Sequence, residues 1–279
     1  MTKRSVFKKT TLALLCTAFI AAAPLAAQAN DPHGSAPAKN PVEAMRFAVK
    51  GNNDFTAKHD KSYFEPFQKG QAPKLAVVAC ADSRVQTDLF GSDPTNNIFM
   101  IRNIGNQVAT AEGSVDYGVR HMPTSVLMVM GHSSCGAIKA AMGEYASESS
   151  GIKRELDTLA EPIKADDKQG DFDSRWAKNI ERNVDYQVAV AQKQYADKIK
   201  SGELVIVGAV YDFNDFYGQG PGTLVVTNVD GETNPEKIKA HKVMKDLTGN
   251  QGLAHVGNMA PETDFSGATA LGYHPADKK

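Results

Sequence analysis

Two short clusters of reactive side chains stand out in this 279-residue sequence. The first reads Cys80-x-Asp82-x-Arg84 and offers a thiol, a carboxylate and a guanidinium at every second position. In an extended backbone, residues two apart point to the same side, so these three side chains can share one face. The second cluster, His132-x-x-Cys135, adds an imidazole and another thiol farther along the chain.

These residue types are suited to binding zinc. Thiolate sulfur and imidazole nitrogen are good zinc ligands, so Cys80, His132 and Cys135 form a candidate metal set. Three protein ligands leave one tetrahedral position open, as in catalytic zinc sites, and water bound there has its pKa lowered to about 7. Asp82 is placed to orient the resulting hydroxide. Arg84 is placed to hold Asp82 away from the metal through paired hydrogen bonds.

The same cysteines allow a structural alternative. In an oxidising compartment two cysteines often form a disulfide, so Cys80 and Cys135 could staple the chain while His132 is an ordinary core histidine. A staple leaves unexplained why Asp82 and Arg84 follow Cys80, and why a histidine precedes Cys135 by three positions. On the residues alone, both alternatives remain open.

Each cluster follows an apolar run that predicts a buried strand, at residues 75–79 and 125–130. If the two strands are parallel and end together, they bring Cys80, His132 and Cys135 to one place. Periodic apolar residues and capping signals predict the other elements. We expect strands at 97–102 and 203–210, an antiparallel edge strand at 223–229, and helices at 41–51, 109–121, 137–142, 152–163, 174–200 and 235–247. This alternation indicates an α/β fold with a mainly parallel β-sheet core flanked by helices.

The composition is that of an ordinary globular protein, with 42% hydrophobic and 23% charged residues. A formal net charge of −1 gives no reason to expect nucleic acid as a partner. Residues 1–29 differ, because a basic start is followed by the apolar run 12–23 and the small-residue site Ala27-Gln28-Ala29. This order is typical of a cleavable secretory signal peptide, and the apolar run is too short to span a membrane comfortably. We therefore expect a periplasmic or secreted protein with no stable membrane anchor after cleavage.

Beyond the two clusters, the sequence resembles the β-class carbonic anhydrases from about residue 41 to about residue 210. The likeness includes three more motifs in the family's order, Lys50-Gly51-Asn52, Arg102-Asn103-Ile104-Gly105-Asn106 and Gly113-Ser114-Val115-Asp116-Tyr117-Gly118. It implies one zinc ion per subunit, bound by Cys80, His132 and Cys135, and a catalytic dyad of Asp82 and Arg84. We place the β-carbonic-anhydrase-like catalytic domain at residues 40–247. It follows a polar, flexible lead-in at 30–39 and precedes an irregular C-terminal extension at 248–279, which departs from the family and shows no clear periodicity.

Gln71, nine positions before Cys80, is similar to a residue of the family's plant-like branch. That branch implies a CO2 pocket formed by Gln71, Phe99, Ile104 and Tyr117. Gln71 stands at the entrance of the first strand, roughly 30 Å from Cys80 if the chain is extended. We therefore expect Gln71 and Tyr117 to reach the pocket from a partner subunit, and Phe99 and Ile104 to line it from the zinc-bearing subunit.

The resemblance implies a zinc lyase that reversibly hydrates CO2 to bicarbonate and a proton, with zinc-bound hydroxide oriented by the dyad. It also implies a homodimer or a dimer of dimers with the site at the subunit interface. One alternative is a zinc hydrolase of another small heterocumulene, such as carbon disulfide, on the same fold. The other is a disulfide-stapled, non-catalytic periplasmic binding protein.

Overall fold

The computed structural model describes residues 36–166, 168–245, 247 and 255–256. The chain divides into two compact units, Met1–Tyr63 and Phe64–Lys279. The expected signal peptide and nearly all of the expected C-terminal extension lie outside the described residues.

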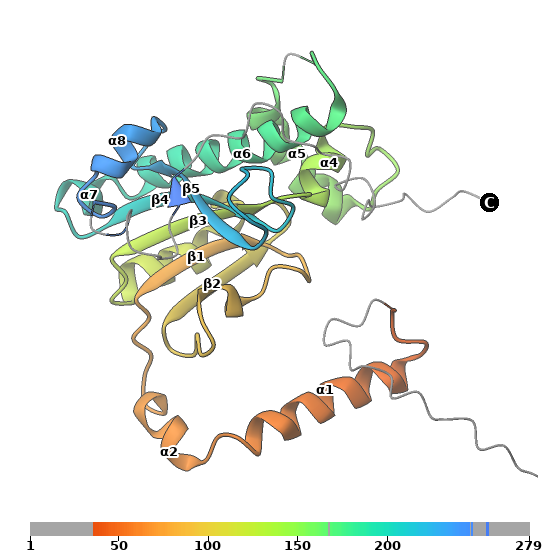
Figure 1. Cartoon of the computed structure of the whole chain (residues 1–279), viewed down its shortest axis with the longest axis vertical. Coiled ribbons are helices and arrows are strands. Elements are labelled where there is room, and N and C mark those ends of the chain that lie inside the picture. Colours follow the sequence, from red (N-terminus) through yellow and green to blue (C-terminus); the bar gives the residue numbers. More distant parts are fainter. Residues whose placement is uncertain (1–35, 167, 246, 248–254, 257–279) are drawn as a thin grey trace, which may run out of the picture. The chain divides into compact units, whose positions relative to one another are not determined.

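A six-stranded sheet, in the order β2-β1-β3-β4-β5-β6, forms the centre of the second unit (Figure 1). The first four strands run parallel, and β5 pairs antiparallel with β4, as the sequence predicts. The strands are β1 (Leu75–Cys80), β2 (Ile98–Asn103), β3 (Val126–His132), β4 (Val205–Asp212), β5 (Thr223–Val229) and β6 (His255–Val256). The two-residue strand β6 pairs with β5, so β5 is not the edge strand that we expected.

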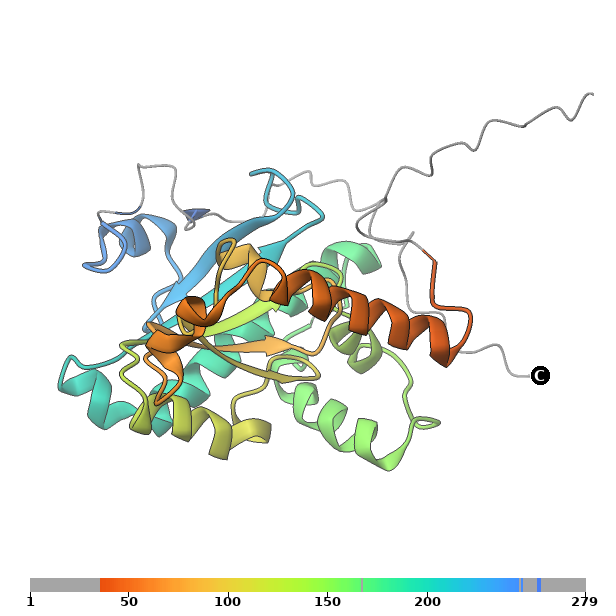
Figure 2. The same cartoon turned by 90° about the horizontal axis from the view of Figure 1, so that it is seen from below.

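Helices cover both faces of this sheet and form two apolar layers. One layer joins side chains of alternate strand positions to α3 (Glu112–Asp116), α4 (Gly136–Ala141), α5 (Ser150–Ile163) and α6 (Phe172–Gln194). The other joins the remaining positions to Val85 and to α8 (Pro235–Ala240). Figure 2 shows α8 and the helices α3–α6 on opposite sides of the strands. Because the central strands are buried on both faces, they read as continuous apolar runs in the sequence.

Several helices differ in extent from the prediction. The expected helix at 109–121 is a succession of a 3₁₀ turn (Ala109–Ala111), α3 and a π-helical turn (Tyr117–His121). The expected helix at 174–200 is interrupted at Tyr195, where α6 ends and α7 (Ala196–Lys200) begins. Helix α8 ends at Ala240 rather than near residue 247. Helix α4 begins one residue before the predicted start, and Cys135 stands at its N-cap without a capping hydrogen bond from its side chain.

The first unit contains α1 (Pro41–Thr56), and α2 (Lys61–Phe64) follows at the boundary with the second unit, before a 3₁₀ turn (Glu65–Phe67). Helix α1 begins at Pro41, as predicted. Its start is capped, because the Asn40 side chain accepts from the Glu43 amide and the Glu43 carboxylate accepts from the Lys39 amide. The helix does not end at Gly51, because a glycine lowers helix stability by only about 1 kcal/mol and the surrounding residues favour the helix.

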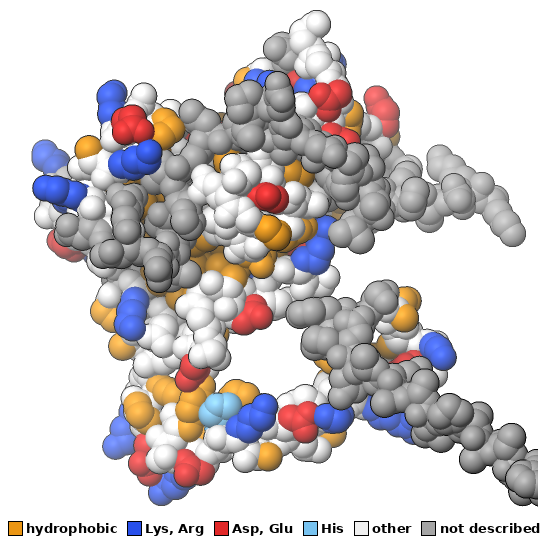
Figure 3. Space-filling view, in the orientation of Figure 1, with side chains coloured by type: hydrophobic (Ala, Val, Ile, Leu, Met, Phe, Trp, Pro, Cys, Tyr) orange, Lys and Arg blue, Asp and Glu red, His pale blue; other side chains and the backbone are white. Residues whose placement is uncertain are grey.

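Helix α1 exposes a series of large apolar side chains. Val42, Met45, Phe47 and Val49 are each more than half exposed, and α1 contains no buried residue. Figure 3 shows apolar side chains among charged ones on the surface of this helix. Among the described residues, no helix is both long and apolar enough to cross a membrane.

Helix α6 packs against the sheet without spare volume at Gly208 in β4. A Cβ atom at this position would lie 2.8 Å from Val184 Cγ1 and 2.8 Å from Asn228 Cβ. Gly208→Ala therefore forces α6 and the sheet apart, and overpacking of this kind lowers the free energy of unfolding by about 1–3 kcal/mol. The change is measured from the urea midpoint of the purified protein.

A matched glycine substitution serves as the control for Gly208→Ala. Gly51 lies inside α1 with nothing within 4 Å of its Cβ position, so Gly51→Ala should leave stability unchanged or raise it by about 0.5–1 kcal/mol. Equal urea midpoints for Gly208→Ala and the unmodified chain would contradict the close packing of α6 on β4.

Candidate metal centre

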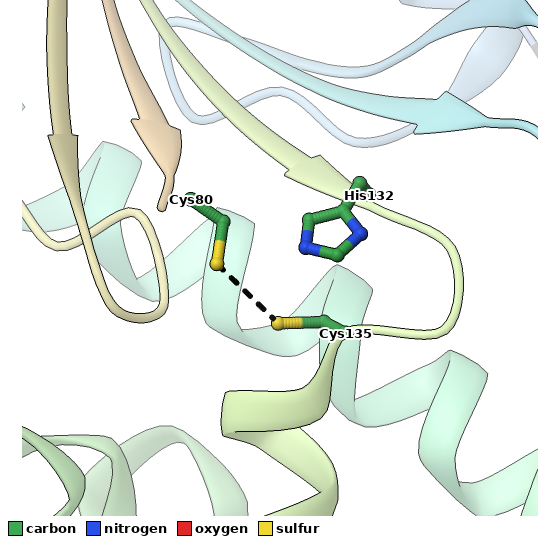
Figure 4. Close-up of side chains that lie close together, drawn as sticks. All are labelled: Cys80, His132 and Cys135. Atoms are coloured by element: carbon green, nitrogen blue, oxygen red, sulfur yellow. Dashed lines mark hydrogen bonds between the residues drawn. The ribbon is translucent and has the colours of Figure 1, made fainter. Parts of the chain in front are cut away.

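The structure brings Cys80, His132 and Cys135 together at one edge of the sheet, as the sequence analysis predicts. Their ligand atoms all lie within 4.8 Å of one another, and all three residues are buried. Cys80 Sγ lies 3.9 Å from Cys135 Sγ, and the imidazole of His132 faces the space beside them (Figure 4). Both cysteines are free thiols, which disagrees with the alternative of a Cys80–Cys135 disulfide.

Parallel pairing of β1 and β3 explains this arrangement. Leu75 pairs with Val126 and Ala79 with Met130, so Cys80 and His132 come at the carboxyl ends of neighbouring strands. After His132 the chain turns sharply through Ser134, whose φ of 55° lies in the left-handed region. The turn returns Cys135 beside Cys80 at the start of α4. Trp176 of α6 is buried and donates from Nε1 to the Cys135 carbonyl at 2.8 Å.

The imidazole of His132 presents one nitrogen to the site. Its Nδ1 lies 2.9 Å from the Ser133 carbonyl, and because a carbonyl only accepts, Nδ1 carries the proton. Nε2 is therefore the unprotonated nitrogen of the neutral ring. It is buried and has no hydrogen-bond partner among the described residues. A buried acceptor without a partner is costly, and a metal ion would satisfy it.

The two thiols are also set up for a cation. The neighbouring Cys135 thiol, with help from His132 and the Gly105 amide, lowers the pKa of Cys80 to about 5. The pKa of Cys135 is instead raised well above its usual value, because Cys135 lies next to Cys80 and is fully buried. Two buried thiolates this close repel each other unless a positive charge lies between them. Two tetrahedral zinc–sulfur bonds place the sulfurs about 3.8 Å apart, so the residues present fit zinc.

Asp82 and Arg84 form a close ion pair beside this cluster. Arg84 donates from Nε to Asp82 Oδ1 at 2.9 Å and from Nη2 to Oδ2 at 2.7 Å. Although partial burial alone would raise it, these hydrogen bonds lower the pKa of Asp82 to about 2. Asp82 Oδ2 is 3.6 Å from His132 Nε2, so the carboxylate borders the metal cluster.

The pair arises by a route that differs from the prediction. Strand β1 ends at Cys80, and residues 81–84 form a turn rather than an extended strand. The Arg84 amide donates to Asp82 Oδ1 at 2.9 Å, and the Val85 amide donates to the Asp82 carbonyl at 3.2 Å. The turn therefore brings Asp82 and Arg84 together, in place of the predicted alternation of side chains along an extended strand.

The four predicted pocket residues do not gather around the cluster within one chain. Ile104 follows β2 directly, next to Gly105, whose amide donates to Cys80 Sγ at 3.4 Å. Phe99 pairs with Ala76, four residues before Cys80 and roughly 13 Å from it along the strand. Its ring contacts that of Tyr117, with 5.9 Å between the centroids. Exposed Gln71 precedes β1, at the end of the strand opposite Cys80. The assignment of Phe99 to the wall beside its own cluster is thus wrong.

Residues after β4 form a further layer around the cluster that the sequence analysis missed. The Ser133 hydroxyl accepts from the amides of Phe213 at 3.0 Å and Asn214 at 3.2 Å. Ser134 donates from its hydroxyl to Asn214 Oδ1 at 2.9 Å. The sequence does contain a signal for this layer, because the aromatic and polar residues Phe213 and Asn214 directly follow a buried strand. The carboxyl ends of parallel strands meet at one edge of the sheet, so residues at that position lie near the site.

Comparisons with known proteins agree with this geometry. Residues 75–222 match the sequence model of the family described as carbonic anhydrase. Carbonic anhydrase 2 of Mycobacterium tuberculosis is 28% identical over 191 residues, which cover 64% of this chain and 92% of that protein.

Solved structures show the same fold. A Coccomyxa β-carbonic anhydrase in complex with acetazolamide is 25% identical, with a TM-score of 0.57 over 72% of this chain and 92% of that one. One of two tetrameric β-carbonic anhydrases from Sordaria macrospora, 23% identical, shares the fold with a TM-score of 0.55 over 61% of this chain and 92% of its own. The chain therefore belongs to the β-carbonic anhydrase family of enzymes.

Proposed function

We propose that this protein is a zinc-dependent carbonic anhydrase that reversibly hydrates CO2 to bicarbonate and a proton. The observation that carries the proposal is the buried Nε2 of His132, which has no hydrogen-bond partner in the part of the chain that the structure describes. It lies beside two free thiols and the Asp82–Arg84 pair. One imidazole nitrogen and two sulfur atoms make three donors, which leaves the fourth position of a tetrahedral metal ion open for a reacting group.

Cys80, His132 and Cys135 would hold the zinc ion. When bound, zinc supplies Lewis acidity that lowers the pKa of water to about 7. The Ser133 carbonyl fixes the imidazole tautomer by accepting from Nδ1. Asp82 is the acceptor that orients the attacking oxygen through a hydrogen bond. Arg84 keeps Asp82 ionised and turned toward itself, as its two hydrogen bonds to the carboxylate indicate.

The substrate pocket is proposed to form between two copies of the chain, as in the plant-like branch. Phe99, Tyr117 and Gln71 lie toward the far end of the strands from their own cluster, so a two-fold partner would supply them. Tyr117 is 46% exposed in the single chain, which suits an interface residue. The exposed apolar side chains of α1 give a second reason to expect another copy. Ile104 would line the pocket from the zinc-bearing chain.

Export and domain organisation are also proposals. Residues 1–29, which lie outside the described residues, keep the basic, apolar and small-residue order of a signal peptide. On this basis the mature enzyme is periplasmic or secreted, with residues 40–247 as its catalytic domain.

Metal content and CO2 hydration test the central proposal together. The mature protein should contain one zinc ion per chain by elemental analysis and should hydrate CO2 in a stopped-flow assay. Cys135→Ser should lose zinc and activity together, because it removes a thiolate ligand. Ser83→Ala, at an exposed serine of the first cluster, should keep both.

Two results would contradict that assignment. Little zinc together with no titratable thiol would indicate the disulfide-stapled protein. Full zinc content without CO2 hydration, but with hydrolysis of carbon disulfide, would indicate the other substrate.

The dyad is tested by substituting each partner. Arg84→Ala should keep zinc but lower kcat roughly 100-fold or more, because the Asp82 carboxylate is then free to bind the metal. Asp82→Asn should also keep zinc and lower kcat, through poor orientation of the attacking oxygen. Turnover near that of the unmodified enzyme in both variants would refute the dyad.

A mixing experiment tests the shared pocket. Gln71→Ala and Cys80→Ser should each be nearly inactive, and Gln71→Ala should keep its zinc. After subunit exchange of equal amounts, half of the dimers are mixed and each has one complete site, so roughly one quarter of full activity should return. A fully active Gln71→Ala variant, or no recovery on mixing despite demonstrated exchange, would contradict the pocket.

Export is tested on protein recovered from the native cell envelope. N-terminal sequencing should begin at Asn30, because signal peptidase cleaves after a small-x-small sequence such as Ala27-Gln28-Ala29. A protein that begins at Met1 or Thr2 would contradict cleavage and export.

A further inference from the structure

The segment after β4 is tied closely to the turn that carries the candidate ligands. Tyr211 pairs with His132, and its carbonyl accepts from the Ser133 amide at 3.0 Å. The Ser133 hydroxyl in turn accepts from the amides of Phe213 and Asn214. These contacts hold the backbone of Phe213 at a fixed distance from the metal cluster.

The Phe213 side chain contacts two residues of the site at once. Its ring lies nearly parallel to the His132 imidazole, with 5.9 Å between the centroids and 25° between the planes. The guanidinium carbon of Arg84 lies 4.8 Å from the centroid of the Phe213 ring. This is a cation–π distance, so the ring attracts the Arg84 charge as well as packing against it.

Phe213 completes the set of contacts that fix Arg84. The guanidinium donates two hydrogen bonds to Asp82 and a third, at 3.1 Å, to the Ser134 carbonyl. Hydrogen bonds act at its edge, whereas the Phe213 ring covers its face. The Arg84 side chain is 32% exposed, so one side of it is not held by the protein core. The contact with the Phe213 ring limits rotation of the guanidinium out of the plane of the Asp82 carboxylate.

The segment that carries Phe213 is anchored on both sides. The Asp212 carboxylate accepts from the Tyr217 amide at 2.9 Å, and the Asp212 carbonyl accepts from the Gly222 amide at 2.7 Å. Tyr217 is buried and donates from its hydroxyl to Glu181 of α6 at 2.7 Å. An anchored segment gives the Phe213 ring a defined position, which a freely moving loop would not.

We propose that Phe213 is a positioning residue, whose ring holds Arg84 on Asp82 and so keeps the Asp82 carboxylate out of the open metal position. The proposal rests on the function proposed above and adds a residue outside both sequence clusters. Phe213 touches neither substrate nor metal in this role, because it acts through Arg84. The same ring restrains the His132 imidazole by stacking.

The consequence is measurable as anion affinity. If the Arg84 guanidinium loses its aromatic cover, the Asp82 carboxylate competes for the open metal position against an external anion. A partly desolvated cation–π contact contributes enough to change that competition by up to about tenfold. Loss of the ring should therefore weaken anion binding without removing the metal.

The test uses the mature protein with cobalt in place of zinc, titrated with thiocyanate and followed by the visible absorption of the metal. Phe213→Leu should hold one cobalt ion per chain and bind thiocyanate about tenfold more weakly than the unmodified protein. Phe213→Tyr, which keeps the ring, should bind it equally well. Phe90→Leu, at a partly buried ring that packs against the same apolar layer as Phe213, is the matched control and should also bind it equally well. Phe213→Met replaces Phe213→Leu if the smaller side chain prevents folding.

A second background separates positioning from general structural damage. With Asp82→Asn, the side chain is a poor competitor for the metal, so adding Phe213→Leu should no longer change thiocyanate affinity. An equal loss in both backgrounds, or no loss in either, would overturn the role of Phe213 while leaving the proposed function intact. An unmodified protein that holds neither zinc nor cobalt would overturn the proposed function and this inference together.

Discussion

The parallel register between β1 and β3 is the constraint on which the site depends. It places Cys80 and His132 at the ends of adjacent strands, and the turn after β3 needs only three residues to bring Cys135 beside them. The register is fixed because both strands are buried on both faces, so a shift by one residue would exchange every side chain between the two apolar layers. The packing of the hydrophobic core therefore sets the geometry of the site.

The electrostatics of these residues favour a bound metal ion over a Cys80–Cys135 disulfide. Cys80 ionises readily while Cys135 resists, and the basic nitrogen of His132 is buried without a proton to donate into the site. Each feature is unfavourable alone, and one divalent cation relieves all of them. The Asp82–Arg84 pair adds a negative group that its partner already satisfies.

The sequence alone predicted the parts of this molecule that are local. Buried strands, the ligand clusters and the start of α1 each follow from residues within a few positions of one another. Long-range contacts were not predictable. Phe213 meets Arg84 and His132 only because β4 pairs with β3. Phe99 meets Tyr117 because the turn Tyr117–His121 packs closely against β2. The prediction that the first helix ends at Gly51 was wrong for another reason. The helix propensity of the neighbouring residues outweighs the weak preference of glycine against a helix.

The close packing of α6 has a consequence for the thermodynamics of metal uptake. The same helix leaves no room at Gly208 and, through Trp176, bonds the backbone of Cys135. We therefore expect the packing of α6, in which no metal ion takes part, to hold the donor set in place. On this basis ion binding should bury almost no additional apolar surface. Uptake should accordingly carry a small heat-capacity change, unlike the coupled folding of a zinc finger, whose chain has no structure until it is loaded.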